Sequence, residues 1–111
     1  MIRLTVKGLS SELNLTPLSL PEPDREINGV YIGDLLSWVM GRAEEGNAWI
    51  TIMSNINILA VASLADTSCI IAAEGVKLSE EVINTAREKD INILYSEAGI
   101  YDTAVFLSQV L

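Results

Sequence analysis

The chain has 111 residues and a formal net charge of −8, with 7 basic and 15 acidic side chains. The basic residues are scattered singly, which excludes the clustered lysines and arginines that binding to nucleic acid or anionic lipid requires. Histidine is absent and Cys69 is the only cysteine, so a single chain offers neither a zinc site built from His and Cys nor a Ser-His or Cys-His nucleophilic pair.

The first 26 residues predict short elements followed by a loop. Arg3–Lys7 alternate as in a strand, Leu9–Leu13 fit one or two helical turns, and Leu15–Leu20 form a second extended piece. Pro21–Glu26 contains two prolines and predicts an exposed connection. The start lacks a signal-peptide pattern, and no apolar run approaches the roughly 20 residues of a membrane span. We therefore expect a cytoplasmic protein that does not enter the membrane.

A regular pattern begins near residue 29. The four apolar strand candidates are Gly29–Ile32, Ala48–Met53, Ser68–Ala73 and Ile91–Tyr95. The segments between them are long enough for helices, and strands linked in this way build a parallel sheet. We expect residues 1–111 to form a single α/β domain. Its fold is a three-layer sandwich with a mostly parallel sheet of about five or six strands and helices on both faces.

Three segments predict helices. Ser79–Lys89 has a serine at the N-cap, acidic residues at its start and basic residues at its end. Asn55–Asp66 is rich in Ile and Val, which favours a strand, but its place between two buried strands favours a crossover helix. Gly99–Leu111 predicts a final helix with more apolar surface than one core-facing stripe requires.

Asp34 predicts the start of a further helix. As the N-cap, it would open a helix over about Leu35–Glu45 that ends at Gly46. Trp38 then lies about 130° from the centre of the apolar stripe, outside the core. A tryptophan so placed more often lies under another chain or a ligand, and we therefore expect a homodimer. The expected interface residues are Trp38, Phe106 and Val110.

In an open parallel sheet, ligands bind at the carboxyl ends of the strands, near the point where strand order reverses. The small, polar and acidic residues expected there are Gly33, Asp34, Ser54, Asn55, Glu74, Gly75 and Ser96. Helix N-termini facing them favour an anion. Ordinary caps and turns explain the same residues, and we favour that interpretation. Cys69 and Trp49 lie in predicted strands, and we expect both side chains to be buried in the core. We expect that the protein binds no metal ion and no cofactor.

Three segments carry a resemblance to a known family: "NGVYIGDLLSWVM", "NINILAVASLAD" and "GVKLSEEVINTAREKDINILYSEAGIYDTA". In this order they are similar to the pattern of the DRTGG domain, from about Leu4 onward. Such domains resemble the amino-terminal part of HPr kinase/phosphorylase, and they occur in phosphotransacetylases and CBS-containing pyrophosphatases. The resemblance implies a three-layer α/β fold and a regulatory or oligomerising role. It carries over no kinase activity, because the chain has no G-x-x-x-x-G-K-[ST] phosphate loop.

The family signature is altered in this chain. Its Asp-Arg pair falls near Asn55-Ile56 and its Thr-Gly-Gly near Ala73-Glu74-Gly75, where only the last glycine matches. Glu74 adds negative charge where a phosphate group would lie. The resemblance allows a nucleotide ligand, and the altered signature disfavours one.

Three functional hypotheses follow. The first is a non-enzymatic regulatory or protein-interaction module that self-associates, with a further partner protein encoded nearby. The second is a sensor of a small ligand, an adenine nucleotide or another anion, at the carboxyl ends of the strands. The third, which we favour least, is a small enzyme with Asp34, Glu74 or Glu97 as acid or base.

Overall fold

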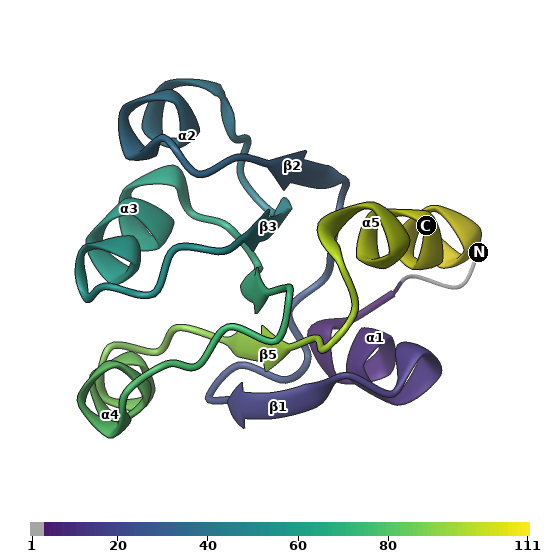
Figure 1. Cartoon of the computed structure of the whole chain (residues 1–111), viewed down its shortest axis with the longest axis horizontal. Coiled ribbons are helices and arrows are strands. Elements are labelled where there is room, and N and C mark those ends of the chain that lie inside the picture. Colours follow the sequence, from purple (N-terminus) through teal and green to yellow (C-terminus); the bar gives the residue numbers. More distant parts are fainter. Residues whose placement is uncertain (1–3) are drawn as a thin grey trace.

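A five-stranded sheet lies between two layers of helices in the computed structural model, which describes residues 4–111 (Figure 1). The strands are β1 (Thr16–Ser19), β2 (Val30–Ile32), β3 (Ala48–Thr51), β4 (Cys69–Ala72) and β5 (Ile93–Tyr95). Their order across the sheet is β1-β5-β4-β3-β2, with β1 antiparallel to β5 and the other neighbours parallel. The predicted α/β fold with a mostly parallel sheet is confirmed.

Helices cover both faces of this sheet. They are α1 (Val6–Leu13), α2 (Leu36–Arg42), α3 (Asn57–Ala65), α4 (Glu80–Glu88) and α5 (Ile100–Val110). The helices α2, α3 and α4 pack on one face, at the left in Figure 1, and α1 and α5 pack on the other. Side chains that alternate along each strand fill the two cores. In β3, Trp49 points into the core beneath α2, α3 and α4, whereas Ala48 and Ile50 point into the core beneath α1 and α5. All three side chains are 0% exposed.

The four parallel strands follow one another across the sheet in the order of the chain. Their connecting helices therefore share one face, and the order of the parallel strands does not reverse. The sheet therefore lacks the reversal of parallel strands beside which ligands bind in many open α/β sheets. The carboxyl ends of β2 to β5 still line up along one edge, and this carboxyl edge carries the predicted ligand residues.

The amino-terminal region differs from the prediction. The expected strand over Arg3–Lys7 is wrong in the part that the structure describes, since α1 begins at Val6; Arg3 itself lies outside the described residues. Thr5 is the N-cap, and its hydroxyl oxygen accepts a hydrogen bond from the Gly8 N–H at 3.0 Å. Val6 and Leu9, three positions apart, are both fully buried, which is helical and not strand spacing.

The later elements agree with their predictions. Helical turns near residues 9–13, an extended piece near residues 15–20 and four parallel strands are all present, as α1, β1 and β2 to β5. The segment Asn55–Asp66, whose Ile and Val content favoured a strand, forms the helix α3. Its position between two parallel strands, which requires a crossover, therefore outweighed its β propensity. The side chain of Ser79 accepts a hydrogen bond from the Val82 N–H at 3.3 Å and caps α4 as predicted. Among the described residues, no helix is long and apolar enough to cross a membrane.

Candidate functional site

The carboxyl edge brings the predicted ligand residues together in two groups. Gly33 and Asp34 follow β2 and contact the end of β3, where the Gly33 N–H donates to the Ile50 carbonyl at 3.2 Å. Glu74 and Gly75 follow β4 and contact the segment after β5. Their N–H groups donate to the carbonyls of Ala98 at 2.8 Å and Ser96 at 3.0 Å.

Asp34 is not a helix N-cap, so that prediction is wrong. The N-cap of α2 is Leu35, in an extended conformation and without a side-chain cap. One oxygen of the Asp34 carboxylate, Oδ1, accepts hydrogen bonds from the Thr51 hydroxyl at 2.8 Å and from the Ile52 N–H at 2.9 Å. The carboxylate thus joins the end of β2 to the end of β3. The helix is also shorter than expected, because it ends at Arg42 rather than near residue 45.

The side chain of Glu74 reaches the N-terminus of α5. Its carboxylate oxygen Oε2 accepts a hydrogen bond from the Ile100 N–H, the first of the helix, at 2.8 Å. A helix N-terminus carries partial positive charge and attracts anions, and here the chain supplies the anion itself. The backbone of Glu74 has φ of 63° and that of Gly75 has φ of 66°. Glycine adopts this left-handed conformation without strain, whereas a glutamate is strained in it.

The remaining predicted residues have local roles. The hydroxyl groups of Ser96 and Thr103 form a buried hydrogen bond at 2.9 Å, which ties the end of β5 to α5. The side-chain oxygen of Asn55 accepts from the Asn57 N–H at 2.9 Å and turns the chain into α3, and Ser54 is exposed just before it. A shallow cavity of about 370 Å³ lies beside Ser96, between the start of β1 and α5.

The chemistry available along these strands is limited. Cys69 is the first residue of β4 and is buried, and burial raises the pKa of its thiol to about 12. The thiol therefore stays protonated and behaves as an apolar group. Trp49 is buried as predicted, and its indole N–H donates to the Gly33 carbonyl at 2.9 Å. Among residues 4–111, no three His, Cys, Asp or Glu side chains cluster closely enough to hold a metal ion.

The predicted interface residues do not lie together. Trp38 is on α2, is 52% exposed, and has the Arg42 guanidinium 3.7 Å from its ring centre, a cation–π contact. Phe106 and Val110 are on α5, in the layer on the opposite side of the sheet. Val110 packs partly into the core there. One contact surface therefore cannot include all three residues.

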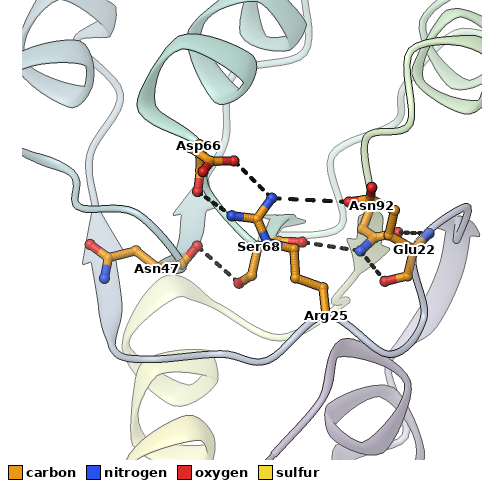
Figure 2. Close-up of polar contacts among 6 residues, drawn as sticks. All are labelled: Glu22, Arg25, Asn47, Asp66, Ser68 and Asn92. Atoms are coloured by element: carbon orange, nitrogen blue, oxygen red, sulfur yellow. Dashed lines mark hydrogen bonds and ion pairs between the residues drawn. The ribbon is translucent and has the colours of Figure 1, made fainter.

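A polar network at the opposite end of the strands was not predicted. Figure 2 shows Arg25 with its guanidinium on the C-terminal end of α3. Its Nη1 lies 2.9 Å from Asp66 Oδ1, and its Nη2 donates to the Asp66 carbonyl oxygen at 2.7 Å. Asn92, only 2% exposed, donates to the carbonyls of Glu22 at 2.7 Å and Ser68 at 3.1 Å, and it accepts from the Glu22 N–H at 3.0 Å.

This network holds the proline-containing loop against the start of the sheet. The loop is exposed or half-buried along its length, as predicted. In addition, Arg25 and Glu22 fix it to α3 and to the segment before β5. The available signal was Asn92 itself, because a polar residue inside an apolar strand segment needs buried hydrogen-bond partners. The side-chain groups of Asn92 are all used by the chain, so the network is structural in character.

The comparisons with known proteins agree with the fold. Residues 21–110 match the family model of the DRTGG domain, and the chain therefore belongs to the DRTGG domain family. A search of curated proteins found no match. Among three matching chains of known structure is a crystal structure of the CBS and DRTGG domains of the regulatory region of Clostridium perfringens pyrophosphatase, complexed with its activator diadenosine tetraphosphate.

That chain has a TM-score of 0.78 and 17% sequence identity with this one. The similarity covers 96% of this chain and 47% of that chain, so this chain spans about half of its length. At this identity the likeness concerns the fold, and it confirms the three-layer α/β architecture of the DRTGG domain.

Proposed function

We propose that this DRTGG domain is a non-enzymatic regulatory module that acts by binding protein and forms a homodimer. The observation that carries the proposal is Trp38, which is 52% exposed on a helix whose inner residue, Val39, is fully buried. A tryptophan has a large apolar area at small conformational cost, and such side chains dominate protein interfaces. The cation–π contact with Arg42 holds the ring in place on the surface.

The carboxyl edge supports the non-enzymatic part of this proposal. The carboxylates of Asp34 and Glu74 both accept hydrogen bonds from backbone N–H groups of their own chain. A catalytic acid or base must instead reach a substrate proton. The Cys69 thiol is buried, with a pKa raised to about 12, and the sequence holds no histidine. These features favour an interaction module over a small enzyme.

A ligand sensor is the second candidate. Two observations favour it: the C. perfringens regulatory region is complexed with diadenosine tetraphosphate, and a cavity of about 370 Å³ adjoins Ser96 and Glu97 in this chain. The ligand residues would be those of the carboxyl edge, from Gly33 and Asp34 to Ser96. Against this candidate, Glu74 already fills the N-terminus of α5, and Glu97 adds a further carboxylate beside the cavity.

We further propose a cytoplasmic location and a partner protein encoded nearby. The single Cys69, which has no second cysteine to pair with, suits a reducing compartment. A module without chemistry of its own acts through another protein, and Trp38 marks a surface for such contacts.

Sedimentation velocity of the unmodified chain tests the dimer. We expect a dimer at tens of micromolar and an association weakened about thirtyfold by Trp38→Ala. A monomeric unmodified chain would refute self-association. Thermal unfolding with ATP, AMP or diadenosine tetraphosphate tests the sensor, because a ligand of the folded state raises the melting temperature. We expect no rise, and a rise that depends on ligand concentration would establish the second candidate.

A further inference from the structure

The helix α3 presents an uncharged outer surface to solvent. Of the five helices among residues 4–111, only α3 contains no charged residue. Its inner side chains, such as Ile58 and Val61, are buried, whereas Ala60, Ser63 and Leu64 are exposed, and Leu64 reaches 73% exposure. A helix that faces water normally has charged residues on its outer side. The composition of α3 is that of a helix covered on both sides.

This uncharged surface continues onto α2. The two helices lie side by side in the same layer (Figure 1). On α2 and just before it, Leu35 and Trp38 are 56% and 52% exposed, and Ile56 at the start of α3 is 41% exposed. The α2/α3 face, as we name this surface, consists of Leu35, Trp38, Ile56, Ala60 and Leu64. These residues include four of the large apolar side chains that remain exposed in the described chain.

The charges around this face favour a second copy of an acidic chain. Two copies with a net charge of −8 each repel one another over most of their surfaces. A shallow groove of about 490 Å³ lies between α3 and α4 beside Leu64, and its lining includes Lys89 and no acidic residue. On the α2 side, the charge nearest Trp38 is the guanidinium of Arg42. The groove and the Trp38 ring thus each adjoin a basic side chain, which favours an acidic partner such as a second copy of this chain.

The apolar area of the α2/α3 face is close to what a dimer needs. Its four large side chains expose roughly 450 Å² of apolar surface, taking about 200 Å² for a whole side chain. A stable interface covers about 800 Å² on each partner, of which about 65% is apolar in homodimers, or roughly 500 Å². The exposed residues Ala60 and Ser63 are small, so the backbone of a facing helix can approach closely.

We propose that the α2/α3 face is the surface through which two copies of this chain pair about a two-fold axis. The proposal rests on the self-association proposed above and specifies its location. It excludes the α5 layer, where Val110 already packs into its own core and Phe106 lines the cavity next to α1. A two-fold interface uses the same patch twice, so each substitution in the α2/α3 face acts at two places in the dimer.

The test is sedimentation equilibrium of charge variants on the two faces of the molecule. Leu64→Glu and Leu64→Arg change the net charge in opposite directions, and we expect both to raise the dimer dissociation constant at least thirtyfold. Tyr101→Glu and Tyr101→Arg are matched controls, because Tyr101 is 78% exposed on α5, in the other layer. We expect both controls to dimerise as the unmodified chain does. Circular dichroism confirms that each variant is folded.

The outcomes separate this proposal from the previous one. If the unmodified chain dimerises and both Leu64 variants dimerise equally well, the location is wrong and self-association stands. If the Tyr101 variants dissociate instead, the interface is on α5 and the location is again wrong. If the unmodified chain is a monomer, self-association and its location both fail. Should a Leu64 variant unfold, Ala60→Glu, also on the exposed side of α3, gives the same comparison.

Discussion

The carboxylate of Glu74 lies 2.8 Å from the backbone nitrogen of Ile100 and caps α5 from 26 positions earlier in the chain. The N-cap residue itself, Gly99, has no side chain with which to do this. A Cβ at Gly99 would lie 3.1 Å from the Glu74 oxygen, so a larger residue there would displace the capping carboxylate slightly. The turn after β4 and the start of α5 therefore depend on one another, and the anion-attracting end of the helix is already filled.

Two substitutions of Glu74 separate the stabilising cap on α5 from the strain of its left-handed backbone. Glu74→Ala removes the cap and keeps a non-glycine residue at φ of 63°, so we expect a loss of about 1 kcal/mol in the free energy of unfolding. Glu74→Gly also removes the cap, but it relieves the left-handed backbone by about 1 kcal/mol. Urea unfolding should therefore rank the glycine variant close to the unmodified protein and above the alanine variant. Equal losses would show that the cap is the only effect.

Asp34 joins two strand ends, and its amide analogue should preserve this contact. Asp34→Asn keeps an Oδ1 acceptor for the Thr51 hydroxyl and the Ile52 N–H, so we expect a change in unfolding free energy below about 0.5 kcal/mol. Asp34→Ala leaves both donors without this acceptor and should cost about 1–2 kcal/mol. A double-mutant cycle with Thr51→Val should give a coupling of at least about 0.5 kcal/mol. Strict additivity of the two changes would contradict the contact.

Asn92 should be among the polar residues whose loss is most damaging. It is 2% exposed, and its side chain satisfies three backbone groups, two on Glu22 and one on Ser68. Asn92→Ala leaves these groups unsatisfied, and we expect a loss of about 2–3 kcal/mol in chemical unfolding. Asn84→Ala is the control, because Asn84 is exposed on α4 and should change stability by less than about 0.5 kcal/mol. Similar losses for both variants would mean that the network contributes little.

The burial of Cys69 predicts how the stability of the fold changes at high pH. Burial raises the pKa of its thiol from 9.0 to about 12 in the folded protein. Below pH 9 both states hold the proton, so the thiol does not alter stability there. Between pH 9 and about 12 the unfolded chain releases the proton and the folded chain keeps it, so stability falls as pH rises.

The matched variant for this prediction is Cys69→Ala, which lacks the titrating group. Unfolding free energies measured across this pH range should fall more steeply for the unmodified protein than for the variant. Iodoacetamide should also alkylate the folded protein far more slowly than the urea-unfolded chain at the same pH, because the thiolate is the reactive form. Parallel pH profiles together with fast alkylation of the folded protein would show that Cys69 is accessible.

Helices and strands that are marked by neighbouring residues, such as a capping serine or an apolar run, could be predicted from the sequence. Ser79 caps α4 through a hydrogen bond to Val82, three positions away, and such a signal is visible in a short segment. The buried strands were equally clear as apolar runs. At Arg3–Lys7 the same approach failed, because a few alternating residues fit either a strand or the first turn of a capped helix.

The candidate site depended on contacts between distant residues and was predicted less well. The position of Asp34 before a helix suggested a cap, but its partners are 17 and 18 positions away at the end of β3. Glu74 was expected to repel an anion, and its real partner is the start of α5. Neither partner can be chosen before the order of the strands is known. The predicted residues do follow the carboxyl ends of the strands, but their contacts could be known only from the tertiary structure.

The strand order also determines how the sheet contacts are distributed along the chain. From β2 to β5, each strand pairs with the next one in sequence, so these pairings close short loops. The pairing of β1 with β5 is different, because it joins Thr16 to Tyr95 and closes a loop that contains the other three strands. Loop-closure entropy rises with the length of the loop, and non-local pairings slow folding. The largest single loop-closure cost in this sheet therefore falls on its one antiparallel pairing, while the four parallel strands can assemble by successive addition of neighbouring units.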